Sequence, residues 1–159
     1  SLIDEDKEIA TKYTTHLSDL YRNMLSFRSK DLVSLKEEWH ILENYIYIQQ
    51  SRFGNAMKLV VDVPDEIMQT KQIVPLALQL LVENALKHNV VSLSSPLTIT
   101  IAATDSNITV RNTHNPKISK EKGEGLGLSN IQRRYSLLTD RKVFYGLRDN
   151  EFIVNLPLL

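Results

Sequence analysis

The stretch PLALQLLVENALKHNVV, residues 75–91, is apolar almost all the way round a helix. This pattern is typical of a helix that is buried in a core. A proline is tolerated in a first helical turn, because the amide that it lacks would have no partner there, so we predict a helix that begins at Pro75. One stripe breaks the pattern: Asn84, Lys87 and His88 are spaced i, i+3 and i+4 and therefore share a face.

Two further helices are predicted before this one. Over residues 7–28, apolar side chains spaced four and three residues apart form a seam for shallow-angle packing against another helix. The seam consists of Tyr13, Leu17, Leu20, Met24 and Phe27. It covers barely two heptads, so a helix docked on its own domain is an equal alternative. The second helix opens at Ser34 with the capping-box pattern Ser-Leu-Lys-Glu and runs to about Phe53.

Strand patterns occupy most of the remaining chain. Residues 57–63 are rich in β-branched side chains and predict a strand. Residues 97–103 and 107–113 alternate apolar and polar side chains around a turn, which predicts a hairpin. A polar loop follows at 114–126, then a helix at 127–138, and a second hairpin that turns at Asp149 and Asn150.

This order of elements predicts an α+β fold: a two-layer sandwich with helices on one face of a mixed, mostly antiparallel sheet, preceded by an N-terminal helix. The chain has 159 residues, long enough for one domain with a real core. Its 19 basic and 19 acidic residues balance, so nothing favours nucleic acid as a partner. There is no cysteine, which excludes disulfides and thiolate chemistry. The opening SLIDEDKE resembles the tail of a helix, which suggests a piece of a longer protein.

A second chemical signal is GEGLGLSN, residues 123–130, where Gly123, Gly125 and Gly127 run directly into a helix. Glycines allow a backbone to approach a ligand closely, and a helix N-terminus offers free amides and partial positive charge. Together these features are suited to phosphate groups. A Rossmann fingerprint would need a glycine where Leu128 stands, and no Walker pattern follows. Alone, the glycines are equally compatible with a flexible loop that binds nothing.

The two signals together predict a nucleotide pocket. The amide oxygen of Asn84 can complete the shell of a Mg²⁺ that is bound chiefly through phosphates. Lys87 and His88, one turn along, can contact phosphate oxygens. The alternative is a helix with one solvent-facing edge, on which Glu83 and Lys87 form an ordinary i,i+4 pair.

These motifs resemble those of a known family. LQLLVENALKHN, followed about forty residues later by GEGLGLSNIQRR, resembles the asparagine and glycine boxes of sensor histidine kinases. That family shares its ATP-binding fold with gyrase, the Hsp90 chaperones and the MutL proteins. LSDLYRNML and VSLKEEWHILENYIYIQQSRF extend the resemblance to the bacterial LytS/YehU type, over nearly the whole chain.

The resemblance implies that Asn84 binds the Mg²⁺ of Mg-ATP, that Lys87 and His88 lie near the phosphates, and that Asn89 lies at the cavity edge. It implies that the glycines hinge a lid and that backbone amides face the phosphates. The cofactor-binding residues of this segment are Gly123, Gly125, Leu126, Gly127 and Leu128. Asn112 stands where the wider superfamily has an adenine-reading aspartate; it can accept the same hydrogen bond without the charge. Leu80 stands where gyrase- and Hsp90-like ATPases have a catalytic glutamate.

By the same resemblance, residues 1–30 are the C-terminal remnant of the dimerisation and phosphoacceptor region, and residues 31–159 are the ATP-binding catalytic domain. The phosphoacceptor histidine is expected upstream of Ser1, since His16 precedes a segment that follows the acceptor helix in relatives. His40 and His114 are expected to be surface residues, and the histidines have no metal-ligand spacing.

The resemblance further implies the cytoplasmic part of a bacterial inner-membrane sensor, a phosphoprotein whose membrane contact is made only by segments outside this chain. It implies a homodimer formed through the N-terminal helices, and phosphoryl relay to a response regulator. The alternative is a non-catalytic dimerisation module with a degenerate nucleotide pocket.

Overall fold

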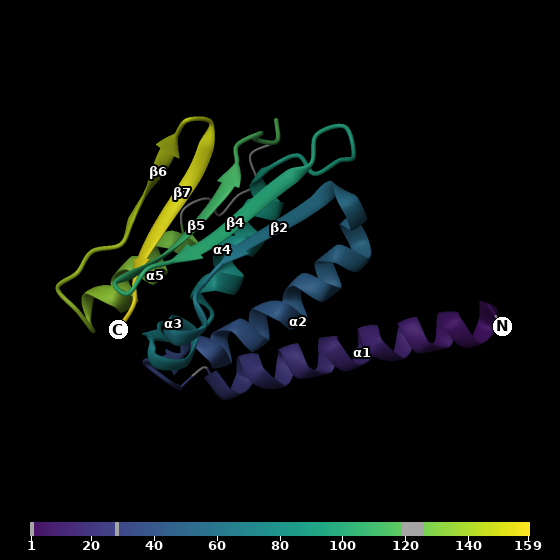
Figure 1. Cartoon of the computed structure of the whole chain (residues 1–159), viewed down its shortest axis with the longest axis horizontal. Coiled ribbons are helices and arrows are strands. Elements are labelled where there is room, and N and C mark those ends of the chain that lie inside the picture. Colours follow the sequence, from purple (N-terminus) through teal and green to yellow (C-terminus); the bar gives the residue numbers. More distant parts are fainter. Residues whose placement is uncertain (1, 28, 119–125) are drawn as a thin grey trace.

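The computed structural model describes residues 2–27, 29–118 and 126–159, and Figure 1 shows the arrangement of their helices and strands. In chain order the elements are α1 (Leu2–Phe27), β1 (Val33–Ser34), α2 (Leu35–Phe53), η1 (Gly54–Ala56), β2 (Met57–Asp62), α3 (Asp65–Thr70), β3 (Gln72–Ile73), α4 (Ala77–His88), β4 (Leu97–Ala103), β5 (Asn107–Thr113), α5 (Leu126–Ser136), β6 (Phe144–Arg148) and β7 (Glu151–Pro157).

The main sheet has five strands in the order β2-β4-β5-β7-β6. β2 runs parallel to β4, and every other neighbouring pair is antiparallel. The last hairpin turns through Asp149 and Asn150, both with positive φ (50° and 62°), as a two-residue turn that matches strand twist requires. The predicted mixed, mostly antiparallel sheet and both predicted hairpins are therefore confirmed.

One face of the sheet is covered by helices. Along β4, Ile99 and Ile101 are fully buried while Thr98 and Thr100 are half-buried on the other face, the alternation expected of a sheet with one packed side. α4 is buried on most of its circumference through Leu78, Leu81, Val82 and Ala85, among others. The apolar helix is thus the centre of the core, as its sequence requires.

α1 runs alongside α2 on the side away from the sheet (Figure 1). Leu20 and Phe27 of the predicted seam are buried, and Leu17 and Met24 pack beside them. The seam therefore packs on a helix of the same chain. His16 takes part in this contact: its Nδ1 lies 2.6 Å from Oδ1 of Asn44, and its ring stacks on Tyr47 with 4.0 Å between centroids.

The structure differs from the sequence prediction at several element ends. α4 begins at Ala77 instead of Pro75, because Leu76 adopts a left-handed conformation with φ of 63°. It ends at His88, and α5 occupies Leu126–Ser136 instead of 127–138. The short helix α3 and the two-stranded sheet of β1 and β3 were not predicted.

Candidate functional site

Asn84, Lys87 and His88 lie half-buried on one edge of α4, while the preceding Glu83 is exposed. Within the described ranges, the side-chain amide of Asn84 makes no hydrogen bond to a neighbouring group. Its oxygen is therefore available as a ligand for a hard cation such as Mg²⁺. The predicted polar stripe is real and reaches the surface of an otherwise buried helix.

Asn89 has a different environment, although it directly follows His88 of the stripe. Its side chain is 4% exposed, its Nδ2 donates to the carbonyl of Ala85 at 2.9 Å, and its Oδ1 accepts from the amide of Asn115 at 2.8 Å. Two backbone bonds reinforce this contact, from Val90 to Asn115 and from Lys117 to His88. Asn89 thus fastens the segment that follows β5 to the C-terminal end of α4.

Asn112, near the end of β5, lies on the helix-facing side of the sheet, opposite Ile99 and Phe152. It is 5% exposed, and its Nδ2 donates to the carbonyl of Thr113 at 2.8 Å. The bond orients the amide so that its oxygen remains the acceptor. Because Asn89 holds the following segment on α4, the structure brings the predicted adenine-reading strand to the same helix as Asn84.

The start of α5 also approaches α4. A Cβ placed on Gly127 would lie 2.8 Å from Cδ2 of Leu80, so a side chain there would require Leu80 or α5 to move. Leu80 precedes Asn84 by one helical turn on the same face. Leu126 opens α5 and Leu128 is half-buried, whereas the predicted Gly123 and Gly125 lie outside the described residues. The α5 N-terminus therefore lies against α4 one helical turn before Asn84.

A buried carboxylate holds the N-terminal end of α4. Glu38 of α2 is 0% exposed, its Oε2 accepts from the Leu76 amide at 2.8 Å, and its Oε1 accepts from the Leu78 amide at 2.9 Å. Burial raises the pKa of Glu38 to about 7, against the opposing effect of these amides and of Arg134. The carboxylate takes the place of a capping side chain, because Leu76 cannot supply one.

Sequence reasoning missed Glu38, since an acidic residue in a first helical turn ordinarily faces solvent. The signal that could have found it is its spacing: three residues from both Leu35 and Ile41, and four from Leu42, all of them buried. That spacing places Glu38 on the packed face of α2.

Two residues of α5 also pack at the N-terminal end of α4. Nη1 of Arg134 donates to the carbonyl of Pro75 at 2.8 Å. The adjacent Tyr135 is 1% exposed, and burial raises the pKa of its hydroxyl. The segment 75–78 is therefore held by α2 and α5 together.

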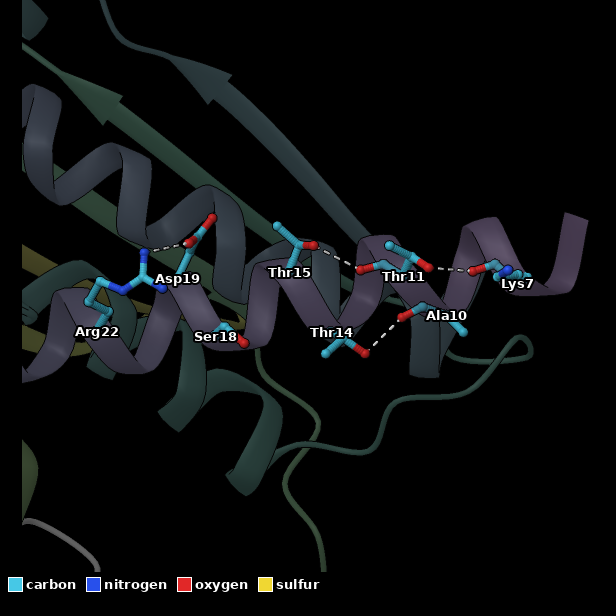
Figure 2. A pocket seen from close by; sticks show the side chains of 8 residues that line it. All are labelled: Lys7, Ala10, Thr11, Thr14, Thr15, Ser18, Asp19 and Arg22. Carbon is cyan, nitrogen blue, oxygen red and sulfur yellow. Dashed lines mark hydrogen bonds and ion pairs between the residues drawn. The ribbon is translucent and has the colours of Figure 1, made fainter. Parts of the chain in front are cut away.

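A hollow also lies on the outer side of α1, and Figure 2 shows its lining from that single helix. The hydroxyls of Thr11, Thr14 and Thr15 donate to carbonyls of their own helix. Asp19 lies 3.6 Å from Arg22. Because these groups already have partners on α1, the hollow offers no converging polar set for a small ligand.

The remaining histidines do not form a metal site in the described part of the chain. His40 is exposed, as predicted, and His114 is half-buried. Across residues 2–27, 29–118 and 126–159, no cluster of three acidic or histidine ligands exists. In the same ranges, no helix has the length and apolar character that crossing a membrane demands.

Comparison with known proteins identifies relatives along most of the chain. A family model described as "Histidine kinase" matches residues 1–57. Sensor protein LytS of Oceanobacillus iheyensis is 35% identical over 158 residues, which cover 87% of this chain and 27% of that protein. Sensor histidine kinase YesM of Bacillus subtilis is 33% identical over 155 residues, which cover 91% of this chain and 26% of that protein. The chain thus spans about a quarter of the length of these curated relatives.

Solved structures share the fold. The catalytic domain of histidine kinase ThkA superposes with a TM-score of 0.56 at 19% identity, covering 79% of this chain and 95% of that domain. The histidine kinase domain of a blue-light-activated kinase from Erythrobacter litoralis gives a TM-score of 0.54 at 18% identity. The match covers 94% of this chain and 74% of that one. The architecture is therefore that of histidine kinase catalytic domains.

Proposed function

This chain is a homologue of the LytS- and YesM-type sensor histidine kinases, and from that premise we propose that it binds Mg-ATP for transfer of the γ-phosphoryl group to a histidine. The observation that carries the proposal is the position of Asn84. Its half-buried amide has no partner in the described ranges, and it lies between the contact of Leu80 with Gly127 and the contact of Asn89 with Asn115. One helix edge thereby receives both the α5 N-terminus and the segment that follows β5.

Each element would have a separate role toward Mg-ATP. The Asn84 oxygen is a hard ligand for Mg²⁺, and Lys87 and His88 lie within two turns on the same edge. Backbone amides at the start of α5, that of Leu128 among them, would offer an anion site at a helix N-terminus. The Asn112 oxygen would accept from the adenine amino group. When bound, Mg-ATP supplies the phosphoryl group, and catalysis consists mainly of positioning and charge neutralisation.

Leu80 favours phosphoryl transfer over ATP hydrolysis. A leucine at this position cannot act as a general base toward water, whereas a carboxylate can. In the structure Leu80 instead makes the apolar contact with α5 at Gly127. An ATP-hydrolysing function of the gyrase or Hsp90 kind is therefore less well supported than a kinase function.

The acceptor and the partners are part of the proposal. We infer a phosphoacceptor histidine in the region that precedes this segment in the whole protein, with relay to an aspartate of a response regulator. His16 is not suited to that role, because its ring is held between Asn44 and Tyr47. Ile9, Tyr21 and Leu25 of α1 are 55%, 61% and 69% exposed, which supports a homodimer contact through this helix. We further propose, from the family resemblance, that this chain is a cytoplasmic part of an inner-membrane protein; the two relatives are named as sensors.

Nucleotide-dependent thermal stability tests the proposal. Mg-ATP at 100 times its Kd should stabilise the wild-type chain by about 2.7 kcal/mol and raise the melting temperature. Asn84→Asp should abolish the increase, because it places a carboxylate beside the phosphates. The matched control is Glu83→Gln, a change at the exposed neighbouring position that should retain the full increase.

Two results would count against this function. A wild-type chain that shows no shift at millimolar Mg-ATP would favour the non-catalytic module with a degenerate pocket. A full shift in Asn84→Asp would place any nucleotide elsewhere on the molecule.

A further inference from the structure

The N-terminal end of α4 is capped from outside its own sequence. Both carboxylate oxygens of Glu38 accept backbone amides of residues 76 and 78, at 2.8 and 2.9 Å. Helix starts ordinarily obtain this acceptor from a local Ser, Thr, Asp or Asn. Here the acceptor comes from α2, so the start of α4 is fixed relative to a helix that lies 38 residues earlier in the chain.

The same point is joined to α5. Arg134 donates to the Pro75 carbonyl at 2.8 Å, and its positive charge faces the Glu38 carboxylate. Tyr135, next to Arg134, is almost completely buried. We call Glu38, Arg134 and residues 75–78 the α4 clamp. Removal of either side chain leaves a buried partner without its bond, which is costly inside a protein.

The α4 clamp and the nucleotide edge lie at opposite ends of the α4–α5 contact. Gly127 meets Leu80 near Asn84, and Arg134 meets Pro75 at the start of α4. Gly127 and Arg134 are seven positions apart, which corresponds to about 10 Å of helix. A rigid helix that is fixed at one end transmits that constraint to its other end. The clamp therefore determines where the amides at the α5 N-terminus lie relative to Asn84.

We propose that Glu38 and Arg134 are positioning residues, which hold the α5 N-terminus in register with Asn84 so that its amides meet the phosphates of the nucleotide. This inference rests on the proposed function. Neither residue lies on the Asn84 edge itself, so both act through α4 and α5 and not by contact with the ligand. The predicted consequence is selective: binding of phosphates depends on the clamp, whereas binding of the adenosine portion at Asn112 does not.

The experiment compares Arg134→Gln with Arg133→Gln. Both variants remove one positive charge from α5, but Arg133 is exposed, and only Arg134 bonds to Pro75. Calorimetric titration with Mg-ATP and, separately, with adenosine measures the two parts of binding. Arg134→Gln should weaken Mg-ATP binding about tenfold, equivalent to ~1.4 kcal/mol. Its adenosine affinity should stay within about twofold of the wild-type value, and Arg133→Gln should leave both affinities unchanged.

A nucleotide-free measurement separates this inference from the function on which it rests. In Arg134→Gln, amide NMR signals of Gly127 and Leu128 should shift, and those of residues 107–113 should not. If Arg134→Gln fails to fold, Arg134→Lys keeps a cation and a donor and should show a smaller loss of the same selective kind.

Two outcomes would overturn the inference, and a third would reject the function on which it rests. Equal Mg-ATP affinity in the two glutamine variants would mean that the clamp does not position α5. Equal losses for adenosine and Mg-ATP would indicate a general structural defect. A wild-type chain that binds no Mg-ATP, although Gly127 and Leu128 shift in Arg134→Gln, would reject the proposed function while leaving the mechanical link between Arg134 and the α5 N-terminus.

Discussion

Asn84 and Asn89 lie five residues apart at the C-terminal half of α4, and their environments assign them different tasks. Asn89 uses both atoms of its amide within the protein, on Ala85 and Asn115. Asn84 is half-buried and uses neither within the described ranges. The sequence shows two asparagines near one another; only the structure indicates which one is available to a ligand.

We expect Asn89→Ala to lower the free energy of unfolding by roughly 1–3 kcal/mol, because the change removes the bonds to the Ala85 carbonyl and from the Asn115 amide, each contributing about 0.5–1.5 kcal/mol. Asn84→Ala should change the same quantity by less than about 0.5 kcal/mol, as is usual at positions without such a bond. Urea unfolding of both variants without nucleotide measures the difference. Equal losses would show that Asn89 does not hold the segment after β5.

At the scale of elements, the carboxylate that caps α4 should make stability depend on pH. Burial raises the pKa of Glu38 from 4.5 to about 7 in the folded protein. Between these values the unfolded chain releases the proton and the folded protein keeps it, so stability decreases as pH rises. The groups that interact with this carboxylate are the amides of 76, 78 and 79, the Arg134 guanidinium and the Tyr135 hydroxyl.

We therefore expect the free energy of unfolding to fall as pH is raised from 4.5 to 7, by up to about 3 kcal/mol from this one group. Glu38→Gln should remove that part of the slope, since glutamine does not titrate. Urea unfolding of both proteins at closely spaced pH values gives the slopes directly. Parallel slopes in the two proteins would exclude Glu38 as the source.

α1 should consist of a stable half and a labile half. Residues 4–15 are exposed, whereas Leu20 and Phe27 are buried against the rest of the chain. A helical segment of about a dozen residues without tertiary packing is marginal in water. In hydrogen exchange, amides of residues 6–15 should exchange much faster than those of residues 20–27. Equal protection along α1 in a monomeric sample would contradict this division.

At the scale of the whole molecule, the features that could be predicted from the sequence are those set by local periodicity and by turn residues. The buried helix, the two hairpins and the turn at Asp149–Asn150 all follow from patterns within a few residues, and each is confirmed. The fold class was predicted from the order of these elements and agrees with the solved structures. The resemblance to sensor histidine kinases agrees with the relatives found. The roles of Asn84, Asn112 and Gly127 in nucleotide binding stay predictions, placed in the structure but not tested by it.

The features that the sequence did not predict depend on residues far apart in the chain. α4 begins at Ala77 because Glu38 and Arg134, distant in sequence, hold the backbone at 75–78. β1 and β3 contain two residues each, too few to produce an alternating pattern. The hydrogen bond between Asn89 and Asn115 was not predicted, because a loop and two strands separate the two residues in the chain.

The single parallel pairing in the sheet also governs how the chain can fold during synthesis. Met57 of β2 pairs with Leu97 of β4, forty positions later, and among the described residues β4 is the one strand that borders β2. At ~5–20 residues per second, a ribosome needs a few seconds to add that length. Throughout that interval β2 has no neighbouring strand with which to pair. The nascent chain therefore exposes an unpaired apolar strand, which a chaperone could shield until β4 emerges.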